Sequence, residues 1–265
     1  MLDKIQMKSK LEALLSGYDF TPKSQVDVMG KKVDIPVKYS DASAYMVFFS
    51  ASLAKVKNLL KSNRLTPISI MGGRCLLGIT FFDYRDCPVG PYHEFTFSIP
   101  VMIDSKFTVP VIPVIFDSFF PNFGYHVILM GADTDIARKH IEQIFPYPTI
   151  NRNTPISLIE DGENLFASIK DGGEEIVSVS GKLPTHYKLT NKKYNTYYEG
   201  NGKLYRVKLN TFSYCSKMFG SNNLHFNFGS HEIAEMIKSL NLSLNPIMSV
   251  YYRQAIEIAT EGEEI

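Results

Sequence analysis

The chain contains no tryptophan, few cysteines, no long apolar run and almost no net charge. Its three cysteines, Cys75, Cys87 and Cys215, are too few and too widely spaced for a disulfide framework or a Cys-x-x-Cys metal site. A net charge of +1 provides no overall field that would attract nucleic acid or an anionic membrane. We therefore expect no metal, no nucleic-acid partner and no membrane partner.

No apolar stretch is long enough to cross a bilayer. Charged residues, among them Lys4, Lys8 and Glu12, interrupt the first residues, so we expect no signal peptide and a cytoplasmic protein. The 265 residues, of which 45% are hydrophobic and 21% charged, suffice for one large core. The composition thus favours a single domain over residues 1–265.

Helical periodicity occurs at both ends of the chain and near its middle. Residues 1–17 carry an apolar stripe that predicts an N-terminal helix. Shorter helices are predicted over 52–62 and 133–146. Ser230 is a suitable N-cap, and Asn245-Pro246 resembles the start of a further helix, so residues 230–260 are predicted to form C-terminal helices packed on the domain.

The rest of the chain is typical of strands. From Ile68 to Met130, runs rich in Val, Ile, Phe and Tyr alternate with Pro, Gly and Asp. Prolines inside Val109–Phe116 indicate either an edge strand or a bulged crossing there. Two Asp-Gly turns predict an antiparallel meander over Ile156–Ser180, and Gly200-Asn201-Gly202 predicts another hairpin. The fold class expected is α+β, with a mostly antiparallel sheet closed into a barrel or cone and with peripheral helices.

The most informative stretch is Gly-Pro-Tyr-His-Glu at 90–94, which leads into an alternating strand. Alternation places Tyr92 and Glu94 on one face of that strand and Phe95 and Phe97 on the other. If the Glu94 face looks into an enclosed sheet, the side chain is a desolvated acid suited to proton transfer. The alternative is an exposed strand glutamate opposite a buried aromatic face.

This stretch resembles the Gly-x-Tyr-x-Glu motif of the acetoacetate decarboxylase family, in which the glutamate belongs to the active site of a closed β fold. Three further segments resemble the family in the same order: Tyr45–Pro67, the segment that ends in Phe145-Pro146, and Ser230–Ala234. The resemblance covers about Val33 to Tyr252. It implies a β barrel or cone of the acetoacetate decarboxylase-like type, a small apolar cavity and a homo-oligomer.

The sequence departs from the family at other site positions. The family's Schiff-base lysine follows the aromatic-Pro pair, where this chain has Tyr147 and Pro148. A second family carboxylate corresponds to a position near Gly78, and a family arginine to a position near His140. Tyr147 could donate a hydrogen bond to a carbonyl or enolate oxygen, or it could simply fill the space of the missing lysine.

The resemblance therefore implies an acetoacetate decarboxylase-like protein that acts as a lyase or related enzyme on a small keto or carboxylic acid, without a cofactor or a Schiff-base lysine. Glu94 and Tyr147 are the candidate catalytic residues. The candidate substrate-binding residues are Tyr92, Gly78, Phe82 and His140. The alternative is a non-catalytic member that binds a small apolar carboxylate or serves as an assembly subunit.

Overall fold

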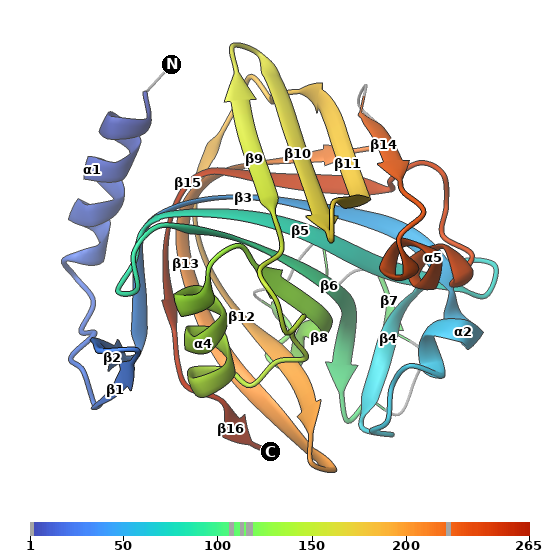
Figure 1. The fold of residues 1–265 in the computed structure, drawn as a ribbon, viewed down its shortest axis with the longest axis horizontal. Coiled ribbons are helices and arrows are strands. Elements are labelled where there is room, and N and C mark those ends of the chain that lie inside the picture. Colours follow the sequence, from blue (N-terminus) through green and yellow to red (C-terminus); the bar gives the residue numbers. More distant parts are fainter. Residues whose placement is uncertain (1–2, 106–108, 112–113, 115–118, 221–223) are drawn as a thin grey trace.

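The computed structural model describes residues 3–105, 109–111, 114, 119–220 and 224–265. Its main sheet is a ring of strands, seen in Figure 1 as long curved ribbons that surround a common interior. In order around the ring the strands are β12 (Lys188–Gly200), β8 (Phe123–Ala132), β6 (Tyr92–Ile103), β5 (Arg74–Asp86), β3 (Val37–Ser52), β15 (Met248–Ala259) and β13 (Lys203–Phe219). Pairing of β13 with β12 closes the ring, and every neighbouring pair is antiparallel except β12–β8. The expected closed, mostly antiparallel α+β fold is confirmed.

Strand alternation divides the ring into an inner and an outer face. On β3, for example, Met46 and Phe48 belong to the cluster of buried side chains inside the ring. The intervening Val47 and Phe49 belong to a second cluster outside it. Each long strand therefore contributes to two cores.

A second sheet covers part of the outer face. It consists of β14 (His225–Phe228), β11 (Glu174–Lys182), β10 (Asn164–Asp171) and β9 (Ile156–Asp161), paired in that order. Its apolar face packs against the outward side chains of the ring strands, including Phe95 and Phe97. The predicted meander over 156–180 is confirmed, with the Asp-Gly turns between antiparallel strands.

Several shorter strands complete the sheets. They are β1 (Ser24–Val28), β2 (Lys31–Ile35), β4 (Leu65–Ile70), β7 (Val109–Pro110) and β16 (Glu263–Glu264). The described part of the strand predicted over 109–116 contains β7, which pairs with β4 in parallel. Residues 112–113 and 115–118 lie outside the described residues.

The helices lie at the periphery of the ring (Figure 1). They are α1 (Lys4–Leu15), α2 (Leu53–Lys57), α4 (Asp135–Ile144) and α5 (Glu232–Ser239). The predicted N-terminal helix is confirmed as α1, whose Met7 and Leu11 pack on Phe212 of β13 and Ile256 of β15. None of the helices in the described part of the chain is long and apolar enough to cross a membrane.

The predicted C-terminal pair of helices is half wrong. Residues 230–240 contain α5, but the expected helix from Asn245 to Ala259 is strand β15. Its Val, Ile and Tyr content suits a strand, and β15 pairs along its length with β13 and β3. These pairings outweigh the helix-start signal of Asn245-Pro246, and they turn Glu257 toward the interior of the ring.

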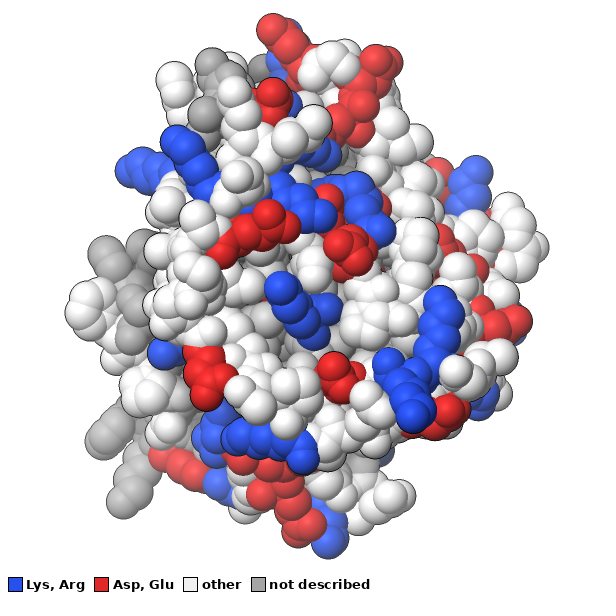
Figure 2. All heavy atoms as spheres, turned by 90° about the vertical axis from the view of Figure 1, so that its left-hand side faces the viewer, with Lys and Arg blue, Asp and Glu red and all other residues white. Residues whose placement is uncertain are grey.

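Charges of both signs are mixed on the face of the molecule that carries α1. Figure 2 shows Lys and Arg side chains interspersed with Asp and Glu there, with no large patch of one sign. Ion pairs such as Lys8–Asp41 and Lys4–Glu160 lie on this side. This face offers no extended cationic surface to a polyanion.

Candidate active site

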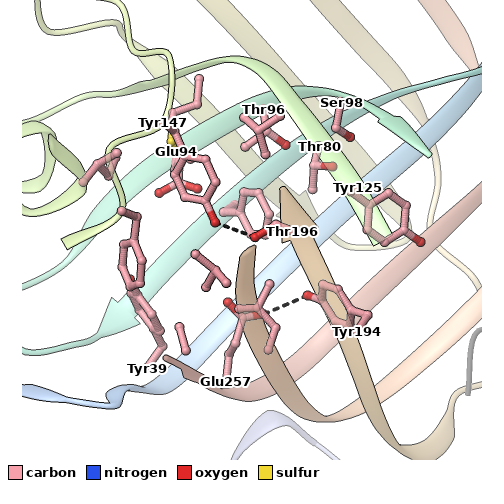
Figure 3. A pocket seen from close by; sticks show the side chains of 18 of the residues that line it. Tyr39, Thr80, Glu94, Thr96, Ser98, Tyr125, Tyr147, Tyr194, Thr196 and Glu257 are labelled. Carbon is pink, nitrogen blue, oxygen red and sulfur yellow. Dashed lines mark hydrogen bonds between the residues drawn. The ribbon is translucent and has the colours of Figure 1, made fainter. Parts of the chain in front are cut away.

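The ring encloses a cavity of about 70 Å³. On the same measure one water molecule needs roughly 10–15 Å³, so there is room for several waters or one small organic molecule. Aromatic and aliphatic side chains form most of its wall, into which a few polar groups project. The polar groups are Tyr39, Thr80, Glu94, Thr96, Ser98, Tyr125, Tyr147, Tyr194, Thr196 and Glu257 (Figure 3).

Strand β6 supplies one wall of the cavity. Glu94, Thr96 and Ser98 alternate along it and point inward, whereas Phe95 and Phe97 point into the outer core. The polar–aromatic alternation in the sequence thus separates the site from the packing beneath the second sheet.

Glu94 is a buried acid. Only 6% of its surface is exposed. Burial raises its pKa to about 8, the nearby charge of Glu257 acts in the same direction, and a hydrogen bond from the Tyr92 hydroxyl to Oε2, at 3.3 Å, opposes both. A carboxyl with such a pKa can both release and accept a proton near neutral pH.

Glu257, from β15, is the second carboxylate of the site and was not predicted from the sequence. Its Oε2 accepts hydrogen bonds from the hydroxyls of Tyr194 and Thr211, each at 3.0 Å. Burial raises its pKa, and these two bonds reduce the effect. The alternation Ala255-x-Glu257-x-Ala259 could have indicated an inward-facing acid if the segment had been interpreted as a strand.

Tyr147 lies beside Glu94 in Figure 3. It follows α4 in the Phe-Pro-Tyr-Pro segment, and its hydroxyl is 2.5 Å from the Thr196 hydroxyl of β12. Burial raises the pKa of the Tyr147 hydroxyl well above the ordinary tyrosine value, so the side chain remains a neutral hydrogen-bond donor. The structure therefore brings Glu94 and Tyr147 to the same cavity.

The candidate binding residues occupy different places. Phe82 lines the cavity, whereas Tyr92 lies next to Glu94 but does not line the cavity. Gly78 does not line the cavity, because the space above its Cα is occupied by Ser98 Oγ and the ring of Phe48. His140 is fully buried on α4, outside the cavity, and reaches it only through the hydroxyl of Tyr39.

Gly78→Ala should destabilise the protein by about 1–3 kcal/mol, because the added Cβ would lie 3.1 Å from Ser98 Oγ and 3.3 Å from the Phe48 ring. Gly17→Ala is a matched control, since the nearest atom to its new Cβ is 3.8 Å away. Urea denaturation of both variants measures the difference. Equal stability of the two would contradict the close packing at Gly78.

Two features of the lining restrict its chemistry. Thr80 Oγ1 is buried against the cavity without a hydrogen-bond partner, so a bound molecule or water would satisfy it. Among the described residues no lysine or arginine lines the cavity, and none of their His, Cys, Asp and Glu side chains form a group of three suited to a metal ion. Proton transfer and hydrogen bonding are the chemistry that this set of side chains offers.

No protein-family model matches the sequence, and no curated protein resembles it at a significant level. Solved structures do resemble the fold. An acetoacetate decarboxylase is 13% identical, with a TM-score of 0.61 over 87% of this chain and 89% of the other. The acetoacetate decarboxylase of Legionella pneumophila is 12% identical, with a TM-score of 0.60 over 95% of each chain.

The enduracididine biosynthesis enzyme MppR, solved in complex with pyruvate, is 10% identical, with a TM-score of 0.57 over 88% of this chain and 91% of that protein. These identities are low, but each match spans nearly the whole of both chains. The resemblance inferred from the sequence around Glu94 is thus confirmed at the level of the fold. The chain has the acetoacetate decarboxylase-like fold.

Proposed function

We propose that this protein is an enzyme that moves a proton at the carbon next to the carbonyl group of a small keto acid, with Glu94 as its acid and base. The observation that carries this proposal is the environment of Glu94. The carboxyl is buried in a small cavity, its pKa is about 8, and the Tyr147 hydroxyl lies near it. Perturbed acids in enclosed cavities are typical of catalytic sites.

The proton transfer requires no group beyond these side chains. Ionised Glu94 takes a proton from the carbon, and the electron pair of the broken C–H bond forms an enolate. Tyr147 donates a hydrogen bond to the enolate oxygen, while Thr196 donates to the Tyr147 oxygen at 2.5 Å. Protonated Glu94 exchanges its proton with solvent and then returns a proton to the carbon, which completes the cycle and in D₂O places deuterium on that carbon.

The proposed substrate is a small keto or carboxylic acid. The cavity volume supports this size class. Pyruvate is bound by MppR, whose fold this chain shares. Since no cation lines the described part of the cavity, the acid group would be held by neutral donors such as the hydroxyls of Thr80 and Thr96.

The proposal is tested by incubating the protein with pyruvate in D₂O and following loss of the methyl signal by proton NMR. Exchange above the rate given by buffer supports the enzyme. The competing proposal is a non-catalytic member of the fold that binds a small carboxylate or serves as an assembly subunit. Saturable pyruvate binding by calorimetry without exchange would favour that second proposal and reject the first.

We expect borohydride to leave no adduct on any lysine when it is added with acetoacetate or pyruvate. Imine formation needs a neutral amine in the cavity, and the position after Phe145-Pro146 holds Tyr147. Intact mass and peptide mapping measure this result. We also expect no efficient decarboxylation of acetoacetate. A stable mass increase on one lysine, such as Lys106 or Lys182, would contradict the proposed imine-free chemistry.

We also propose that the protein is a cytoplasmic homo-oligomer. Phe119 is 77% exposed at the surface and lies next to Phe120, an apolar pair that would suit a contact between subunits. Light scattering of the purified protein measures the assembly, and a monomer at micromolar concentration would reject this proposal.

A further inference from the structure

A second and larger pocket lies beside the cavity. This outer pocket has a volume of about 460 Å³. Tyr194 and Leu209 line both the outer pocket and the cavity, so these two residues lie between them. They are direct partners in the register of β12 and β13. Whatever binds in the outer pocket therefore lies against the wall of the candidate active site.

The outer pocket lies at the seam where β12 meets β8. These strands pair only over Asn195–Tyr197 of β12, the shortest of the pairings that close the ring, whereas β12 pairs with β13 along its whole length. Pro121 and Phe123 line the pocket on one side of the seam, and Lys193 and Asn195 line it on the other. Asn195 Nδ2 donates to the backbone oxygens of Pro121 and Phe123, at 2.9 and 3.0 Å, which holds the seam together. Because β12 extends past the start of β8 here, residues from both faces of β12 border the pocket.

Most of the wall of the outer pocket is apolar. Phe123 is buried, whereas Phe20 and Phe120 are only partly buried, so part of their surface is open to a ligand. The other apolar residues of the wall are Pro36, Pro121, Leu209 and Ile258. A ligand with an apolar body would remove this surface from water, which favours binding in pockets of this kind.

The charge of the outer pocket is opposite to that of the cavity. Lys193 and Lys208 line the outer pocket and are exposed, and its described lining contains no Asp or Glu. Lys208 Nζ lies 3.0 Å from Glu263 Oε1, whereas none of the described acidic side chains forms an ion pair with Lys193. The described lining of the cavity holds Glu94 and Glu257 and no cation. An anion is therefore attracted to the outer pocket more strongly than to the cavity.

A polar atom of the outer pocket also lacks a partner. Asn210 lines the pocket, and in the register of β12 and β13 it lies opposite Lys193. Its Oδ1 is buried and has no hydrogen-bond partner among the described residues. Because buried polar atoms are almost always hydrogen-bonded, a bound water or a polar group of a ligand would complete this site.

We propose that the outer pocket is a second binding site, which takes small organic anions that combine a carboxylate with an apolar body. The apolar body packs against Phe20 and Phe120, and the carboxylate pairs with Lys193 and Lys208. Two cations in an apolar hollow suit a single anionic group, whereas a nucleic acid would need a longer row of cations to match its phosphates.

The bound anion would lie next to the polar groups of the cavity without entering it. Tyr194 borders the outer pocket on one side, and on the other its hydroxyl donates to Glu257 Oε2 at 3.0 Å (Figure 3). Binding in the outer pocket requires no chemistry at Glu94, so the site can exist whether or not the protein is an enzyme.

The absence of tryptophan from the chain gives a direct test. Phe120→Trp places a single tryptophan at the outer pocket, and the probe is 3-nitrobenzoate, an aromatic acid whose nitro group quenches tryptophan fluorescence at short range. We expect saturable quenching in this variant. Phe219→Trp is the matched control, because Phe219 is 60% exposed and does not line the outer pocket, and it should show no saturable quenching.

The role of the two lysines is tested by changing them together. Lys193→Gln with Lys208→Gln should raise the dissociation constant of 3-nitrobenzoate by roughly three- to tenfold, the sum of two exposed charge interactions. Lys57→Gln with Lys170→Gln makes the same change in net charge on exposed residues elsewhere and should leave the constant unchanged. Added salt and replacement of the acid by its neutral amide, 3-nitrobenzamide, should weaken binding to the unmodified lysines.

Calorimetry repeats the lysine comparison without a tryptophan, so a Trp variant that fails to fold leaves the test intact. No binding of 3-nitrobenzoate, equal affinity for the acid and the amide, or equal effects of the two lysine pairs would overturn the proposal. Loss of binding in Glu94→Gln would also overturn it, because the ligand would then lie in the cavity. Binding in the outer pocket without pyruvate exchange would reject the enzyme alone, and exchange without binding of 3-nitrobenzoate would reject the outer site alone.

Discussion

Glu94→Gln should lower the rate of pyruvate deuterium exchange by roughly 10²–10⁴-fold, the usual contribution of a positioned acid–base group. The amide keeps the size of the carboxyl but cannot accept and return a proton. Glu142→Gln, on the exposed side of α4, is the control that should leave the rate unchanged, since its carboxylate pairs with Lys139 and Arg138 outside the cavity. Proton NMR under identical conditions measures all three proteins.

Glu257→Gln should retain the exchange activity but shift its dependence on pH. The charge of Glu257 is one cause of the raised Glu94 pKa. Without that charge Glu94 should ionise at lower pH, so the exchange rate should begin to increase at a lower pH than in the unmodified protein. An exchange rate in Glu94→Gln within threefold of the unmodified protein would contradict the role of Glu94. A pH profile unchanged in Glu257→Gln would contradict the coupling of the two acids.

The parts of the fold that could be predicted are those specified by neighbouring residues. Alternation along Tyr92–Ile103 is enough to place Glu94 on one face and Phe95 on the other, because a strand's side chains alternate whatever it pairs with. The Asp-Gly turns of 156–180 likewise depend on local backbone preferences. Both predictions agree with the structure for this reason.

The second acid could not be predicted because it depends on long-range pairing. Residues 248–259 contain apolar side chains compatible with either a buried strand or a helix, and Asn245-Pro246 favours the helix locally. Only the neighbouring β3 and β13 decide in favour of a strand. Glu257 enters the cavity as a consequence, which no spacing relative to Glu94 could reveal.

The relation of His140 to the site has a similar origin. The position of His140 corresponds to one near a family arginine, but α4 turns the neighbouring Ile141 to the cavity, and the His140 imidazole contacts Tyr39 instead. Contact between α4 and β3 joins residues 101 positions apart. The resemblance to the family indicates that His140 lies near the site, and the packing of α4 decides which side chain it contacts.

The stability difference between Glu94→Gln and the unmodified protein should grow from pH 5 to pH 9, in favour of the variant, by about 3–5 kcal/mol. The pKa of Glu94 is raised from 4.5 to about 8, so the folded state holds its proton over a range in which the unfolded chain has lost it. The unfolded state therefore binds fewer protons between these values, and stability conferred by the neutral acid falls as pH rises through this window.

Urea denaturation of both proteins at pH 5, 7 and 9 measures this difference. Other groups titrate over the same range, and burial raises the pKa of Glu257 as it raises that of Glu94. Their contributions are largely common to both proteins and cancel when the two free energies of unfolding are subtracted. The remainder reports the ionisation of Glu94 itself. A difference that stays constant from pH 5 to pH 9 would mean that Glu94 ionises in the folded protein as readily as in water, and the buried acid on which the proposed chemistry depends would not exist.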